Sequence, residues 1–123
     1  MKALVVDDNK VSALELSKKL ELLGVDSVTA LNGEDALDIF KSSGEGEFDF
    51  IFMDIMMPEK KGTEVAARIR QADRSDARKI PIIAVTGITY DVVNRALEVS
   101  GISGVLKKPI DMDLLKSVIG SAK

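Results

Sequence analysis

The sequence predicts an α/β domain built on an open parallel sheet. Five short apolar runs recur along the chain, and each is followed by a stretch whose apolar residues have helical spacing. This alternation is typical of parallel strands joined by crossover helices. With 123 residues, 46% of them hydrophobic, the chain can form one hydrophobic core. We therefore expect one βαβ-type domain over residues 1–123.

The first predicted strand ends in acidic residues. Residues 3–6 are apolar without alternation, as expected for a strand covered on both faces, and Asp7, Asp8 and Asn9 follow. Gly24 is placed to end the next helix. The apolar positions of that helix are Ala13, Leu16, Leu20 and Leu23.

The second predicted strand, residues 25–30, is weakly apolar and is expected at an edge of the sheet. Asn32 is placed to cap the helix that follows, with Ala36, Leu37 and Phe40 as its apolar positions. Residues 42–47 are polar and contain two glycines, so we expect a loop before the chain re-enters the core.

The third predicted strand, residues 50–53, is the most hydrophobic run and is expected at the centre of the sheet. It ends in Asp54, which gives a second acidic strand terminus. A helix is then expected from about Gly62, with Val65, Ala66 and Ile69 inward. A charged connection leads from it to the fourth strand.

The fourth predicted strand covers residues 80–85, in which Pro81 suits the beginning, and Thr86 and Gly87 follow it. The helix after this strand is expected to end at Gly101. Its apolar positions are Val93, Ala96 and Leu97.

The fifth predicted strand, residues 105–106, is short and precedes Lys107, Lys108 and Pro109. Asp111 is placed to cap the last helix. The apolar positions of this helix are Leu114, Leu115, Val118 and Ile119.

Composition excludes several kinds of chemistry. The chain has no Cys and no His, so disulfides, thiolate catalysis, histidine acid–base chemistry and the usual zinc ligand sets are absent. The net charge is −3, from 17 basic and 20 acidic side chains, and the scattered basic residues do not predict nucleic-acid binding. Residues 2–6 are too short for a secretory signal and no run could span a membrane, so we expect a cytoplasmic protein.

Polar side chains follow several of the predicted strands. The ligand crevice of an open α/β sheet lies outside the carboxyl ends of its strands, so these side chains should surround one crevice: Asp7, Asp8, Asp54, Thr86 and Lys108. Taken singly, Asp8 or Asn9 also fits a turn or a helix cap. Three clustered carboxylates need a cation, however, and without His or Cys the residues favour a hard one such as Mg²⁺.

This cluster predicts phosphoryl chemistry. A carboxylate can attack phosphorus when the charge of the transferring group is neutralised. A metal on one side and Lys108 on another can do so, and Thr86 can donate a hydrogen bond to a third. Asp54 is therefore a candidate phosphoacceptor.

Four motifs resemble those of the response-regulator receiver family, in order and across essentially the whole chain. They are VVDDN at residues 5–9, MDIMMP at 53–58, VTG at 85–87 and LKKP at 106–109. The resemblance implies a doubly wound, flavodoxin-like, five-stranded parallel sheet in the order 2-1-3-4-5, with helices on both faces. It also implies that Asp54 takes a phosphoryl group from a sensor histidine kinase or a histidine phosphotransfer domain, in two-component or phosphorelay signalling. Such a protein is a phosphoacceptor switch that assists its own phosphorylation, not an enzyme.

The resemblance assigns the site residues one by one. Asp8 matches the direct metal ligand, Asp7 its water-mediated partner, and Met56 the residue whose backbone carbonyl completes the protein ligands. Lys108, not Lys107, matches the family's lysine because it immediately precedes Pro109. Thr86 matches the threonine that moves toward the acyl phosphate as the affinity for a downstream protein changes.

Some positions depart from the family's pattern or suggest partners. Val105 stands where Tyr or Phe is common, so aromatic gating is in doubt. Met56 and Ile88 flank the phosphoryl site and are apolar, from which we hypothesise a long-lived acyl phosphate. Kinases dock on the family's first helix and on the loop after the fifth strand, which makes candidate contacts of Val11, Leu14 and Ile110, with core packing as the alternative.

Other functions remain open at this point. A receiver-like module could bind partners without phosphorylation. A phosphatase with an aspartyl nucleophile would need a second acid two residues after Asp54, where Met56 stands. A flavodoxin-like cofactor carrier would need a hydroxyl- and glycine-rich loop in place of the acidic residues 7–10. Because no effector segment follows the last predicted helix, we expect output through another protein, from a stand-alone receiver or one excised from a longer chain.

Overall fold

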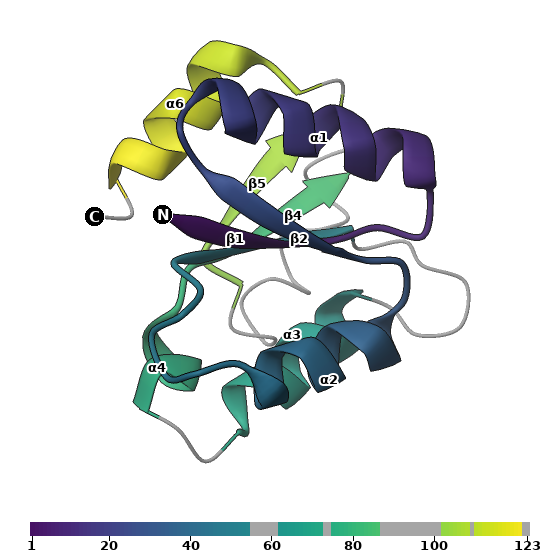
Figure 1. Ribbon diagram of the computed structural model, residues 1–123, viewed down its shortest axis with the longest axis vertical. Coiled ribbons are helices and arrows are strands. Elements are labelled where there is room, and N and C mark those ends of the chain that lie inside the picture. The colour runs from purple at the N-terminus through teal and green to yellow at the C-terminus, as the bar shows by residue number, and fades with distance from the viewer. Residues whose placement is uncertain (55–61, 73–74, 87–101, 109, 122–123) are drawn as a thin grey trace.

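The structure is a computed structural model that describes residues 1–54, 62–72, 75–86, 102–108 and 110–121 (Figure 1). Its elements in chain order are β1 (Lys2–Val6), α1 (Lys10–Leu22), β2 (Asp26–Ala30), α2 (Gly33–Ser42), β3 (Phe50–Asp54), α3 (Gly62–Arg70), α4 (Ser75–Lys79), β4 (Ile82–Thr86), β5 (Gly104–Lys107) and α6 (Met112–Ser121). The predicted helix that ends at Gly101 lies outside the described residues.

All strands pair in parallel, in the order β2-β1-β3-β4-β5. This confirms the predicted sheet, with β3 at its centre and β2 at an edge. The order reverses between β1 and β3, which are hydrogen-bonded neighbours with Val6 opposite Met53. Ligands of open α/β sheets bind at such a reversal, outside the carboxyl ends of the strands.

Helices cover both faces of the sheet. In Figure 1, α1 and α6 lie on one side, and α2, α3 and α4 lie on the other. Alternate residues of β1 enter different cores: Ala3 and Val5 pack in the cluster with Leu20 of α1, whereas Leu4 and Val6 pack in the cluster that contains residues of α2 and α3. Burial on both faces explains why the central strands read as continuous apolar runs.

The predicted caps form as expected. Asn9 Oδ1 accepts hydrogen bonds from the backbone N–H groups of Val11 and Ser12 at 2.9 and 3.1 Å, so it caps α1. Asn32 and Asp111 cap α2 and α6 in the same way. Gly24 follows α1 with φ of +78°, a left-handed conformation that favours glycine after a helix.

Some boundaries differ from the prediction. β4 begins at Ile82, so the predicted start at residue 80 is wrong by two residues. Pro81 has no N–H to donate, yet its carbonyl oxygen accepts a hydrogen bond from Ile51 N at 2.9 Å beside the strand. The charged connection before it contains α4, which the sequence did not predict because its five residues show no apolar periodicity.

The last helix buries only part of its apolar sequence. Leu115 is fully buried, whereas Leu114 is 56% exposed. Within the part of the chain that the structure describes, no helix has the length and hydropathy needed to cross a membrane.

Candidate functional site

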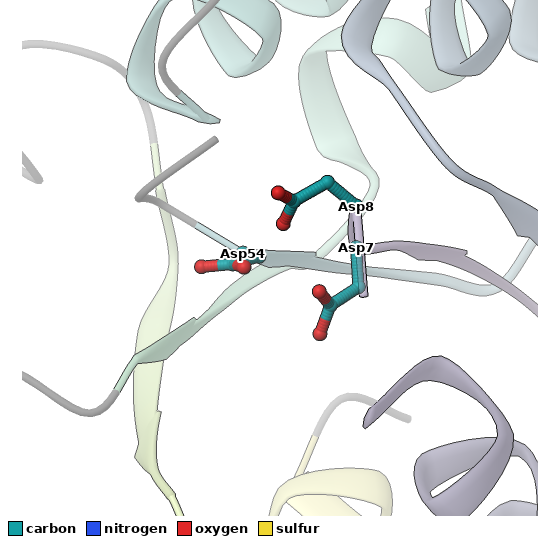
Figure 2. Close-up of side chains that lie close together, drawn as sticks. All are labelled: Asp7, Asp8 and Asp54. Atoms are coloured by element: carbon teal, nitrogen blue, oxygen red, sulfur yellow. The ribbon is translucent and has the colours of Figure 1, made fainter. Parts of the chain in front are cut away.

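Asp7, Asp8 and Asp54 come together at the carboxyl edge of the sheet, as Figure 2 shows. Val6 of β1 lies opposite Met53 of β3, so the next residues of the chain, Asp7 and Asp54, lie side by side. One carboxylate oxygen from each acid lies within 4.8 Å of the other two. The predicted convergence of the three acids is therefore confirmed.

The three acids differ in exposure. Asp7 and Asp54 are 5% and 8% exposed, whereas Asp8 is exposed at the rim. Ionised carboxylates in buried positions are costly unless hydrogen bonds or opposite charges compensate them. The site therefore requires specific partners for its two buried acids.

Asp7 is held from three directions. Its Oδ1 accepts a hydrogen bond from Asn9 N at 3.0 Å, and its Oδ2 accepts one from Lys108 Nζ at 3.1 Å. Its own backbone N–H donates to the carbonyl of Ala30, at the end of β2, at 3.1 Å. Since Asn9 caps α1, the start of this helix fixes the orientation of the buried carboxylate.

Lys108 provides positive charge to the buried acids. Its Nζ lies 3.1 Å from Asp7 Oδ2 and 3.8 Å from Asp54 Oδ2, and its side chain is 30% exposed. Lys107, the last residue of β5, immediately precedes Lys108 and is exposed. The structure thus brings Lys108 to the acids, as the sequence predicted. Among the described residues, this ammonium group contacts two of the three carboxylates.

The acid cluster fits a small hard cation. Its ligand atoms are carboxylate oxygens, which Mg²⁺ prefers. Two ligands of one Mg²⁺ ion lie at most about 4.2 Å apart, because each Mg–O bond is about 2.1 Å long. The spacing of up to 4.8 Å between the oxygens therefore needs only small side-chain movements. A cation here would also reduce the repulsion among the three carboxylates.

Other predicted site residues are described only in part. Met56, Gly87, Ile88 and Pro109 lie outside the described residues. Thr86 ends β4 opposite Lys107, but its side chain lies outside the described part of the chain. Val105 is half-buried in β5, opposite Ala84.

The candidate docking residues fall into two groups. Val11 and Leu14 are 66% and 55% exposed on α1, so the alternative that they pack in the core is wrong. Ile110 is half-buried and packs against the core under α1 and α6.

One contact near the site was not predicted from the sequence: Lys19 Nζ donates a hydrogen bond to the carbonyl oxygen of Ile110 at 2.8 Å. No sequence pattern signals this contact, because it joins residues 91 positions apart.

The strand order and the acidic site together define a flavodoxin-like domain with an oxygen-ligand site of metal-binding type. Residues 3–120 match the sequence model of the Response regulator receiver domain family, and the chain belongs to that family. It is therefore a receiver domain, which is a phosphoacceptor rather than a classical enzyme.

The chain is similar both to small regulators and to parts of larger proteins. Polar-differentiation response regulator DivK of Brucella anthropi is 30% identical over 123 residues, which cover 97% of this chain and 96% of DivK. Hybrid signal transduction histidine kinase L of Dictyostelium discoideum is 33% identical over 119 residues, but the chain spans only 7% of its length, while the match covers 96% of this chain. The structure of chemotaxis protein CheY4 of Vibrio cholerae has a TM-score of 0.89 and 27% identity, covering 99% of this chain and 98% of CheY4.

Proposed function

We propose that Asp54 accepts a phosphoryl group beside a Mg²⁺ ion held by Asp7 and Asp8. The observation that carries this proposal is the convergence of three carboxylates and the Lys108 ammonium group at the carboxyl edge of the sheet. Asp7 has both oxygens engaged by Asn9 and Lys108, which suits a fixed ligand. Asp54 ends the central strand within reach of Lys108, which suits the nucleophile.

The transfer is a displacement at phosphorus. A carboxylate oxygen of Asp54 forms a bond to phosphorus while the bond from phosphorus to a histidine nitrogen of the donor breaks, and that nitrogen keeps the electron pair. Lys108 Nζ, 3.8 Å from Asp54 Oδ2, stabilises the negative charge of the phosphoryl oxygens. When bound, Mg²⁺ supplies further neutralisation of that charge. By the family resemblance, the Met56 carbonyl would complete the metal ligands and the Thr86 hydroxyl would contact the phosphoryl group.

The donor is a sensor histidine kinase or a histidine phosphotransfer domain, and we expect the exchange in the cytoplasm. Val11 and Leu14 give the first turns of α1 an exposed apolar surface, and Asn9 joins this helix directly to the acid cluster. A partner that covers this surface can bring a phosphohistidine to the crevice. The phosphorylated domain then changes its affinity for a downstream protein.

Intact mass spectrometry tests the proposal directly. The parent, Asp54→Asn and Asp38→Asn are incubated with acetyl phosphate and Mg²⁺, and then again with EDTA in place of Mg²⁺. Asp38 is an exposed acid on α2 and serves as the matched control. One phosphoryl increment is expected in the parent and in Asp38→Asn, only with Mg²⁺, and none in Asp54→Asn. A parent without an increment contradicts the proposal and favours a module that binds partners without phosphorylation.

A further inference from the structure

A hydrogen bond ties α1 to the segment between β5 and α6. Lys19 Nζ donates to the Ile110 carbonyl oxygen at 2.8 Å, and both residues are half-buried. Ile110 lies two residues after Lys108, whose ammonium group contacts the buried acids. The hydrogen bond from Lys19 therefore holds the same segment that contains Lys108.

This segment is anchored at both ends by other contacts. Lys107 belongs to β5 and lies opposite Thr86 in the ladder. Asp111 accepts a hydrogen bond from Asp113 N at 2.7 Å and thereby caps α6. The Ile110 carbonyl lies between β5 and α6. It therefore needs a hydrogen-bond donor from outside the strand pairing and outside the helix. Lys19 provides that hydrogen bond from the neighbouring helix.

Ile110 packs against the core under α1 and α6, and the segment also borders a pocket. A partly open pocket of about 310 Å³ is lined by residues of α1 and of this segment: Ser12, Glu15, Leu16, Lys19, Lys108 and Ile110. Side chains beside such a space have fewer packing contacts than those in a filled core. The hydrogen bond from Lys19 to Ile110 lies beside this pocket and restrains the segment.

We propose that Lys19 is a positioning residue. Its hydrogen bond to the Ile110 carbonyl holds the Lys108 ammonium group at the observed distances from Asp7 and Asp54. This inference rests on the proposed function, in which Lys108 stabilises the transferring phosphoryl group. A shift of about 1 Å would take the 3.1 Å contact of Lys108 with Asp7 beyond hydrogen-bond range. Misplacement by about 1 Å can slow an enzyme reaction by about 100-fold.

Three variants test the role of Lys19 in the reaction. Lys19→Met removes the ammonium group and keeps an apolar stem, Lys19→Arg keeps a donor, and Lys18→Met changes an exposed neighbour on the same helix. With saturating Mg²⁺ and acetyl phosphate, Lys19→Met should lower the rate constant of phosphorylation about tenfold. The half-saturating concentration of acetyl phosphate should change little. Lys18→Met should stay within about twofold of the parent, and Lys19→Arg should recover most of the rate.

A second measurement does not depend on phosphorylation. Amide ¹H–¹⁵N spectra of the three variants without metal or donor should show changes in Lys19→Met that reach Lys108 and Asp7, and Lys18→Met should lack them. Changes confined to Ile110 and Asp111, or a rate in Lys19→Met equal to that in Lys18→Met, would overturn the positioning role. If the parent itself takes no phosphoryl group, the proposed function fails and the spectra alone decide the role of Lys19.

Discussion

Lys108 and Asp7 form an ion pair of 3.1 Å across 101 residues of sequence, and the Asp7 side chain is only 7% exposed. The same ammonium group lies 3.8 Å from Asp54 Oδ2. A pair with one buried carboxylate is less screened than a pair on the surface, and loss of one partner leaves a buried charge uncompensated. Lys108 therefore compensates two buried acids and is also within reach of the proposed phosphoryl site.

Replacement of Lys108 tests both of these roles. Lys108→Met should slow phosphorylation by acetyl phosphate about 100-fold, because one charged group that stabilises the transferring phosphoryl is lost. The variant should also unfold more easily, by about 1–2 kcal/mol, because Asp7 and Asp54 lose a counter-ion that is partly screened by solvent. Lys107→Met is the matched control, since Lys107 is exposed in the preceding position. Equal phosphorylation rates in the two variants would rule out a special role for Lys108.

Magnesium should stabilise the native domain. A ligand at about 100 times its Kd raises the free energy of unfolding by about 2.7 kcal/mol when it binds only the native state. Melting curves in a Mg²⁺ titration should therefore shift upward with the logarithm of free metal, and monovalent salt at equal ionic strength should not reproduce the shift. Asp8→Asn should reduce the gain, because it removes a carboxylate at the rim of the cluster. Asp38→Asn should retain the gain, and an unchanged melting curve of the parent would count against the metal site.

Much of the site could be predicted from the sequence because it depends on the ends of buried strands. Residues 3–6 and 50–53 are continuous apolar runs, since helices cover both faces of their strands, and each run is followed by acid. Because all strands of a parallel sheet end at the same edge, Asp7, Asp8 and Asp54 could be placed at one edge, and the pairing of β1 with β3 brings them together there. The strand order came from the family resemblance, because apolar runs do not specify which strands are neighbours.

Contacts between distant loops could not be predicted in this way. The short helix α4 is joined to the loop before β3 by two carboxylates: Glu45 accepts hydrogen bonds from Ser75, and Asp76 Oδ2 accepts one from Gly46 N at 2.8 Å. These partners are about 30 residues apart and leave no periodic pattern. The bond from Lys19 to Ile110 is of the same kind.

The exposed apolar surface of α1 should matter for a protein donor but not for a small one. Leu14→Asp should slow transfer from a phosphorylated histidine kinase or phosphotransfer domain at least about tenfold, because a charge in an apolar contact is costly. Phosphorylation by acetyl phosphate should be unchanged. Leu22→Asp adds the same charge at a 79% exposed position at the other end of α1, so it should keep transfer near the parent rate. Equal slowing by both substitutions would contradict docking at the start of the helix.

Two leucines on α1 give a matched test of the core. Leu20 is fully buried in the cluster with Ala3, Phe52 and Leu115, whereas Leu22 is 79% exposed. Leu20→Ala should lower the free energy of unfolding by about 2–5 kcal/mol, because it removes buried methyl groups and leaves a cavity. Leu22→Ala should change it by less than about 0.5 kcal/mol. Urea denaturation measures both variants, and similar losses would contradict the assignment of the inward face.

The contact between Glu45 and Ser75 should be visible in the titration of Glu45. Hydrogen bonds from the Ser75 hydroxyl, and then from its backbone N–H, hold the pKa of Glu45 below its ordinary value of 4.5. A lowered folded-state pKa means that the contact stabilises the fold above the ordinary value and that this contribution is lost as the pH falls through the lowered one. In Ser75→Ala, the pKa of Glu45 should move up toward 4.5 without reaching it, because the backbone hydrogen bond remains. Carboxyl ¹³C shifts recorded against pH measure this change, with Ser42→Ala as the control at another exposed serine. A Glu45 pKa that is the same in the parent and in Ser75→Ala would show that the hydroxyl does not bind this carboxylate in solution, and that only backbone N–H groups join α4 and the loop through Glu45 and Asp76.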